Sequence, residues 1–136
     1  MTEPFRATIT VRFGDVDRAG IVYFPRFLNY IHIALEEFFS DVVDIDYPML
    51  IQEHGFAFPT VHPEMDFLRP LRYGDRVGVE VEVEKLGTSS VTWCYRLYRP
   101  GESEPAAVGR QVTVATDMST FEKLDLPAWL RDKLTV

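Results

Sequence analysis

The chain has 136 residues, of which 46% are hydrophobic and 13% aromatic, and its formal net charge at pH 7 is −7. With no signal peptide and no apolar run near the roughly 18 residues of a membrane span, this composition predicts one cytosolic domain over residues 1–136. The acidic charge excludes non-specific binding to nucleic acid, which requires basic side chains that neutralise phosphates.

The first predicted element is a strand over residues 5–13. Apolar side chains alternate with polar ones along it, which is the pattern of a strand with one buried face. The apolar set is Phe5, Ala7, Ile9, Val11 and Phe13.

A loop over residues 14–24 follows, and the next predicted element is a helix that begins at Pro25. Proline suits a first helical position because it lacks the N–H that the first turn leaves unpaired. Over the next 15 or so residues, apolar side chains cover most of the helical circumference. A helix of this kind must be covered by a large apolar surface, which predicts that it lies centrally in the fold.

The second half of the chain predicts a sheet. Residues 40–58 read as irregular or short helical structure, and a short helix is expected over 127–134. Between them lie four predicted strands, over residues 60–68, 77–84, 91–98 and 106–116. In the first of these, Pro63 indicates an edge or a bulge, and Val61, Met65 and Phe67 form the expected inward face. Short connections favour antiparallel pairing, so the predicted class is α+β, with an antiparallel sheet wrapped around the central helix.

The loop before the helix carries two carboxylates, Asp15 and Asp17. An aspartate is ionised at neutral pH unless it is strongly buried, so it can attack a carbonyl carbon or deprotonate a water molecule. The helix start supplies free N–H groups and the positive end of the helix dipole, which stabilise an oxyanion. The same residue types also form turns and helix caps. The loop is therefore either a catalytic site or a structural device.

Two segments in this order resemble the 4-hydroxybenzoyl-CoA thioesterase family. They are FGDVDRAGIVYFP at residues 13–25 and FLRPLRYGD at 67–75, and the resemblance extends over roughly 5–117. It implies a hotdog fold, in which about five antiparallel strands wrap around the helix, and an acyl-CoA thioesterase. It also implies Asp17 as nucleophile or general base and the backbone N–H of Phe24 as oxyanion donor. The family uses no metal or redox cofactor and forms dimers or tetramers with the active site at a subunit interface.

The resemblance further predicts Gly20, Tyr23 and His32 as substrate-binding residues. In hydroxybenzoyl-specific relatives, an aspartate that reaches the para-hydroxyl is expected at the position of His32, so the histidine leaves the acyl group open. Its alternative role is a polar helix position at a subunit contact. Relatives that act on short aliphatic acyl groups tend to carry a histidine where this chain has Phe24, which favours an aromatic or larger acyl group. His32, His54 and His62 share no metal-ligand spacing.

The phosphates of CoA have no obvious partner. The turn at 87–89, which is basic in some relatives, is uncharged here, and the candidate cations are Lys85, Arg69, Arg72, Arg96 and Arg110. An acidic stripe is expected to repel phosphates from one sheet face; it consists of Glu80, Glu82 and Glu84. For Asp15 we expect a structural role, as the acceptor that holds the loop.

The predicted function is hydrolysis of an aromatic acyl-CoA, benzoyl- or hydroxybenzoyl-like, to the free acid and CoA. The alternatives are a thioesterase for short aliphatic acyl-CoA, a thioesterase for acyl-carrier-protein, and a non-catalytic hotdog protein that binds acyl-CoA. The acidic surface disfavours the carrier protein, which is usually acidic too.

Overall fold

The computed structural model describes residues 3–135. Its strands are β1 (Phe5–Thr10), β2 (Phe56–Ala57), β3 (Thr60–Phe67), β4 (Arg76–Leu86), β5 (Ser90–Tyr98), β6 (Ala107–Val114) and β7 (Thr116–Asp117). Its α-helices are α1 (Pro25–Phe38), α2 (Tyr47–His54) and α3 (Ala128–Leu134). A 3₁₀ turn, Phe13–Asp15, precedes α1, and a π-helical segment, Phe39–Val43, follows it.

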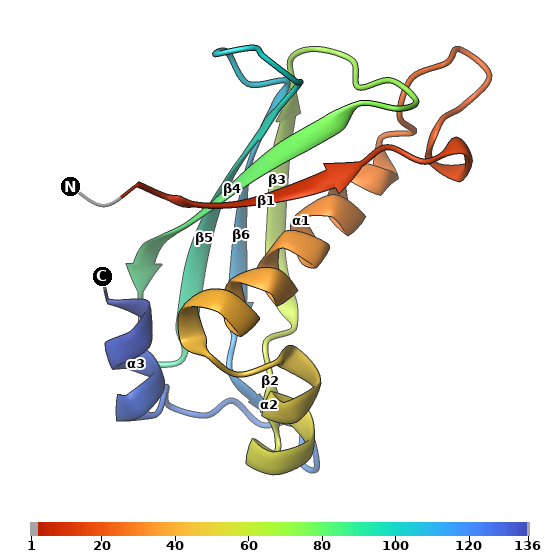
Figure 1. Cartoon of the computed structure of the whole chain (residues 1–136). Coiled ribbons are helices and arrows are strands. Elements are labelled where there is room, and N and C mark those ends of the chain that lie inside the picture. Colours follow the sequence, from red (N-terminus) through yellow and green to blue (C-terminus); the bar gives the residue numbers. More distant parts are fainter. Residues whose placement is uncertain (1–2, 136) are drawn as a thin grey trace.

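Five strands form one antiparallel sheet in the order β1-β4-β5-β6-β3, and β2 pairs separately with β7. Helix α1 crosses one face of this sheet, and α3 lies at the opposite end from the loop that precedes α1 (Figure 1). Pro25 is the first residue of α1, as its missing N–H predicts. The predicted α+β class, with a sheet curved around a long apolar helix, is confirmed.

The core lies between α1 and the inward faces of the central strands. The alternating set of β5, which is Val91, Trp93, Tyr95 and Leu97, is fully buried. The ring of Phe38 from α1 meets Trp93 edge to face, with 5.2 Å between centroids. The polar atoms of this layer are paired, since Trp93 Nε1 donates to Thr113 Oγ1 at 2.9 Å. Trp93 and Tyr95 are therefore core residues.

Phe13 does not belong to the apolar face of the first strand, which is a correction to the sequence pattern. The ladder between β1 and β4 ends at the pair Thr10 and Arg76, and the last inward residue is Val11, whose N–H donates to the Asp75 carbonyl at 2.8 Å. Beyond it the chain turns into the 3₁₀ segment, which leaves the Phe13 side chain 78% exposed.

Strand β3 confirms one expectation and overturns another. It is an edge strand, paired only with β6 and with an irregular register at Thr60 and His62, as Pro63 suggests. The expected inward face is wrong, because Val61 is 60% and Phe67 48% exposed. The main strand contacts of helix α1 are with β1 and β4, and it meets β3 at the end of that strand, where Phe27 contacts Phe67. The rest of the β3 pattern therefore has no helix to pack against.

The boundaries of the remaining helices and strands differ slightly from those predicted from the sequence. The segment 40–58 contains α2 and a left-handed residue, Asp44, which ends the π-helical segment. The strand expected over 106–116 is divided, because Thr116 leaves the main sheet to pair with Ala57. No helix within residues 3–135 has the length and apolar character to cross a membrane.

Candidate active site

The loop before α1 is a short hairpin that holds Asp17 at its tip. Val16 and Val22 form an antiparallel bridge, and the Asp17 N–H donates to the Ile21 carbonyl at 2.9 Å. The turn closes through the Gly20 N–H, which donates to the Asp17 carbonyl at 3.0 Å. Gly20 has a φ of +84°, a left-handed conformation that glycine adopts without steric cost. Its clear structural role is thus to shape the tip that carries the carboxylate.

The Asp17 carboxylate is exposed and only partly used by the protein. Oδ1 accepts the Ala19 N–H at 2.9 Å, which fixes the side chain over its own turn. In the described chain, no arginine, lysine or histidine lies within 4.0 Å of this carboxylate. Oδ2 therefore remains available to a substrate or a water molecule.

Asp15 holds the hairpin to the helix. Its Oδ2 accepts the Tyr30 hydroxyl at 2.8 Å and the Arg12 N–H at 3.0 Å, and its carbonyl accepts the Tyr23 N–H at 2.9 Å. Arg26 Nε lies 3.8 Å from the other carboxylate oxygen. Burial, and then the hydrogen bond to Asp15, raises the pKa of Tyr30, so the hydroxyl stays protonated and donates. These contacts confirm the structural role expected for Asp15.

The start of α1 offers one unpaired amide. The Arg26 N–H donates to the Tyr23 carbonyl at 2.8 Å, the Phe27 N–H donates to the Phe24 carbonyl at 3.1 Å, and Pro25 has no N–H. For the Phe24 N–H, the described residues provide no hydrogen-bond acceptor. This group stands at the positive end of the helix dipole on an exposed residue, so it can donate to an oxygen that gains negative charge.

An apolar cavity of about 550 Å³ opens beside this amide. Its lining consists of Ile21, Val22, Phe24, Phe27, Phe67, Leu68, Arg69 and Pro70. The Phe67 ring meets Phe27 at 4.9 Å and Phe24 at 6.2 Å between centroids, both edge to face. Sequence reasoning missed Phe67 and Leu68 as site residues. The available signal was two adjacent apolar residues at a strand end, which alternation cannot bury on one face.

Tyr23 and His32, the other predicted substrate-binding residues, have different surroundings and do not lie together. Tyr23 is exposed, and its ring lies 5.5 Å from that of Phe24, at the rim of the cavity. The ring of His32 lies 5.9 Å from that of Tyr47 in α2, and its Nε2 is 3.4 Å from Glu36 Oε2. His32 comes about 12 Å along the helix from Phe24. A single chain does not bring it to the cavity.

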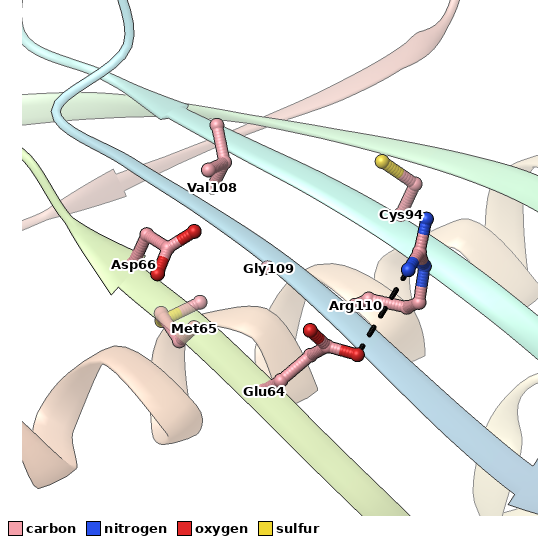
Figure 2. Close-up of a pocket in the computed structure, with 7 residues that line it drawn as sticks. All are labelled: Glu64, Met65, Asp66, Cys94, Val108, Gly109 and Arg110. Atoms are coloured by element: carbon pink, nitrogen blue, oxygen red, sulfur yellow. Dashed lines mark ion pairs between the residues drawn. The ribbon is translucent and has the colours of Figure 1, made fainter.

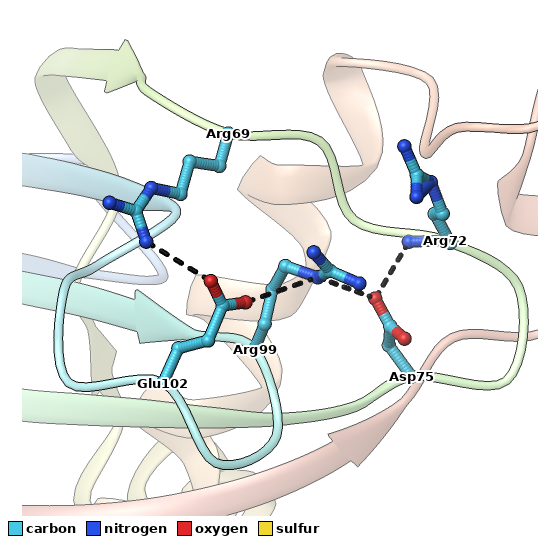
Figure 3. A network of polar contacts seen from close by, with 5 residues as sticks. All are labelled: Arg69, Arg72, Asp75, Arg99 and Glu102. Atoms are coloured by element: carbon cyan, nitrogen blue, oxygen red, sulfur yellow. Dashed lines mark hydrogen bonds and ion pairs between the residues drawn. The ribbon is translucent and has the colours of Figure 1, made fainter.

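Figure 3 shows the arginines next to the site. Arg69 and Arg99 form ion pairs there, whereas the guanidinium of Arg72 does not. Arg69 Nη1 lies 3.0 Å from Glu102 Oε1, and Arg99 Nε lies 3.4 Å from both Glu102 and Asp75. Arg72 joins this network only through its backbone N–H, which donates to Asp75 Oδ2 at 2.9 Å. Its guanidinium turns away from the carboxylates (Figure 3).

Each carboxylate of the expected acidic stripe forms an ion pair with an arginine. On β4, Glu80 lies 3.8 Å from Arg6 of the neighbouring strand β1, and Glu82 lies 3.6 Å from Arg96 of the neighbouring strand β5. Glu84 lies 2.6 Å from Arg110, which reaches it across β5 from β6. The pKa of Glu84 is lowered by its hydrogen bonds to Arg110. Arginines of β1, β5 and β6 thus neutralise the stripe, and two of them, Arg96 and Arg110, are candidate phosphate ligands.

A smaller hollow of about 200 Å³ lies on this outer face (Figure 2). Arg110 and Glu64 line it, 3.9 Å apart, together with Cys94, whose pKa is raised by burial. Throughout residues 3–135, no three His, Cys, Asp or Glu side chains gather closely enough to hold a metal ion.

Residues 11–134 match the family described as the thioesterase-like superfamily. The chain is 32% identical over 127 residues to a 1,4-dihydroxy-2-naphthoyl-CoA hydrolase from Synechococcus elongatus, covering 93% of this chain and 91% of that protein. It is 34% identical over 118 residues to a protein of the same name from Nostoc punctiforme, covering 87% and 78%. The solved structure of a 1,4-dihydroxy-2-naphthoyl-CoA thioesterase from Synechocystis has a TM-score of 0.87 and 26% identity, covering 97% of this chain and 96% of that chain.

These matches confirm the hotdog fold and the thioesterase assignment that the two sequence segments suggested. The narrower assignment to the 4-hydroxybenzoyl-CoA branch stays a prediction. The chain belongs to the thioesterase-like superfamily.

Proposed function

We propose that the protein hydrolyses an aromatic acyl-CoA to the free acid and CoA, with Asp17 as nucleophile or general base and the Phe24 N–H as oxyanion donor. One observation carries the proposal: a carboxylate with a free oxygen and an unpaired helix amide belong to one hairpin-helix unit beside an aromatic cavity. The relatives named above, at 32% and 34% identity, support the reaction class.

The chemistry follows two balanced routes. In the first, an Asp17 oxygen attacks the thioester carbonyl carbon, the oxyanion accepts the Phe24 N–H, and collapse expels the CoA thiolate and leaves an anhydride that water hydrolyses. In the second, Asp17 removes a proton from water, whose oxygen attacks the same carbon; collapse of the oxyanion expels the CoA thiolate, which takes up the proton from Asp17. One well-placed oxyanion donor typically lowers such a barrier by about 3–4 kcal/mol. Both routes use the same two groups.

The cavity favours an aromatic acyl group. Rings that meet edge to face gain about 0.5–1.5 kcal/mol beyond the burial of their area, and Phe24, Phe27 and Phe67 present such edges. The relatives' names specify a dihydroxynaphthoyl group, which is a bicyclic aromatic acyl group. We extend the proposed substrates accordingly from benzoyl to naphthoyl rings, with Tyr23 at the rim of the cavity.

A panel of acyl-CoA thioesters with detection of the released thiol tests this function. Wild type is expected to hydrolyse benzoyl-, hydroxybenzoyl- or dihydroxynaphthoyl-CoA with a higher kcat/KM than acetyl- or hexanoyl-CoA. Phe67→Ala removes one aromatic wall, so KM for the best aromatic substrate is expected to rise about fivefold. Phe121→Ala, which removes an exposed ring elsewhere, is the control. Hydrolysis of no thioester would refute the function, and a preference for short aliphatic groups would refute the aromatic substrate.

We also propose that two copies pair through β3, because its outer edge and both faces are exposed and carry apolar side chains such as Val61. Light scattering is expected to give at least twice the chain mass of 15.7 kDa. Val61→Lys is expected to shift the mass towards the monomer, whereas Ile51→Lys, at an exposed apolar position of α2, is not. Because His32 does not reach the cavity of its own chain, we propose that it contacts the substrate across this subunit interface. A monomeric wild type would contradict the pairing.

A further inference from the structure

Beside the proposed active site lies an exposed aromatic pair that the core does not use. The rings of Phe13 and Tyr73 meet at 5.9 Å between centroids, and their side chains are 78% and 62% exposed. They come from two segments that lie side by side, because the Gly74 N–H donates to the Val11 carbonyl at 3.1 Å. Exposed rings that contact each other have apolar surface available for a flat partner.

The same corner carries guanidinium groups that form no ion pair in the part of the chain that the structure describes. Within residues 3–135, the guanidinium groups of Arg12, Arg72 and Arg76 have no carboxylate within 4.0 Å, whereas those of Arg69 and Arg99 are paired with acids. The carboxylates of Asp15 and Asp75 accept the backbone N–H groups of Arg12 and Arg72 instead. The chain as a whole has a net charge of −7, so guanidinium groups without an ion pair distinguish this corner as a place where an anionic ligand can bind. The free guanidinium of Arg72 is visible in Figure 3.

Arg72 is also tied directly to the catalytic hairpin. It forms an antiparallel bridge with Ile21, and the Val22 N–H donates to the Leu71 carbonyl at 2.8 Å. Ile21 and Val22 line the apolar cavity, so Arg72 and Tyr73 follow directly after a segment that flanks it. A ligand whose reacting end occupies the cavity can therefore extend a flexible arm to this corner.

We propose that Phe13, Tyr73, Arg72 and Arg12 form a nucleotide site that holds the adenosine 3′-phosphate 5′-diphosphate end of CoA. The adenine ring stacks on the aromatic pair, since every base has a face that stacks on an aromatic side chain. The phosphates accept hydrogen bonds from the guanidinium groups. Such hydrogen bonds between ionised groups are charge-assisted and therefore strong. This inference rests on the proposed function, and it supplies the cations that the uncharged turn at 87–89 lacks.

Isothermal titration with free CoA tests the site without requiring turnover. Wild type is expected to bind CoA, and Arg72→Gln and Tyr73→Ser are each expected to weaken binding about tenfold, since each loses one charge-assisted bond or one stacking face. Matched controls at the other end of the molecule are Lys133→Gln and Phe121→Ser, which remove an exposed charge and an exposed ring. Both are expected to bind CoA as wild type does.

Kinetics with two thioesters of one acyl group separate this inference from the function. The acyl-N-acetylcysteamine thioester lacks the nucleotide, so Arg72→Gln is expected to raise KM for the acyl-CoA about tenfold and leave the values for the short thioester unchanged. If wild type hydrolyses acyl-CoA but all variants bind CoA equally, the nucleotide site is refuted and the function stands. If wild type neither binds nor hydrolyses any acyl-CoA, both are refuted.

Discussion

Asp17→Asn is expected to lower kcat for the best acyl-CoA by about 10²–10⁴-fold, the range over which a positioned acid or base accelerates a reaction. The amide keeps the Oδ1 acceptor for the Ala19 N–H at 2.9 Å, so the hairpin tip retains its shape. What it loses is the charge and the basicity of the second oxygen. Urea unfolding is expected to give the same free energy as wild type.

The matched control for this substitution is Asp117→Asn. Asp117 Oδ1 accepts the Ser119 N–H at 2.7 Å, which is the same local geometry on a turn far from the hairpin. Its replacement is expected to leave kcat unchanged. Asp17→Asn with wild-type turnover would remove Asp17 from the mechanism, even if the protein proves to be an active thioesterase.

Asp15→Ala is expected to lower the free energy of unfolding by about 2 kcal/mol and to reduce kcat/KM at least tenfold. The buried hydroxyl of Tyr30 loses its acceptor, and an unpaired buried donor costs about 1–3 kcal/mol. The Arg12 N–H loses its acceptor as well, so the turn that carries Asp17 is no longer held to the helix. Urea unfolding and acyl-CoA kinetics measure the two effects.

Tyr30→Phe separates the two contributions. It removes the donor and leaves Asp15 bonded to the Arg12 N–H, so the expected loss of stability is smaller, about 1 kcal/mol. The hairpin keeps its anchor, and kcat/KM is expected to fall less than in Asp15→Ala. Equal stability of Asp15→Ala and wild type would show that these hydrogen bonds contribute nothing to the hold on the loop.

The spacing of apolar residues in the sequence predicted the strands and the helix that form the core, because burial of each depends on a pattern within its own segment. The alternation in β5 and the proline at the start of α1 each describe a residue and its immediate surroundings. The pattern failed where a residue's partner is distant in the sequence. Val61 and Phe13 alternate correctly with polar neighbours, yet Val61 is 60% exposed and the ladder of β1 ends before Phe13.

The site divides in the same way. The hairpin that carries Asp17 and the start of α1 are contiguous in the sequence. Residues 13–25 were therefore sufficient to predict this part of the site. The wall from Phe67 to Pro70 comes from a segment more than 40 residues away, and only the fold brings it to Phe24. The pairing of Glu80, Glu82 and Glu84 likewise depends on the strand order, which no stretch of the sequence specifies by itself.

The single free amide at the start of α1 bears on product release. Pro25 has no N–H, and the N–H groups of Arg26 and Phe27 are already bonded, so within residues 3–135 the Phe24 N–H, on a residue that lines the cavity, is the donor of this helix start without an acceptor. That is sufficient for one oxyanion oxygen, but a carboxylate product has two oxygens and a full charge, and it would lie close to the negative charge of Asp17. In the proposed mechanism, a helix start with a single donor beside an acidic side chain therefore binds the transient oxyanion better than the finished acid, and this difference would favour departure of the acid after each turnover.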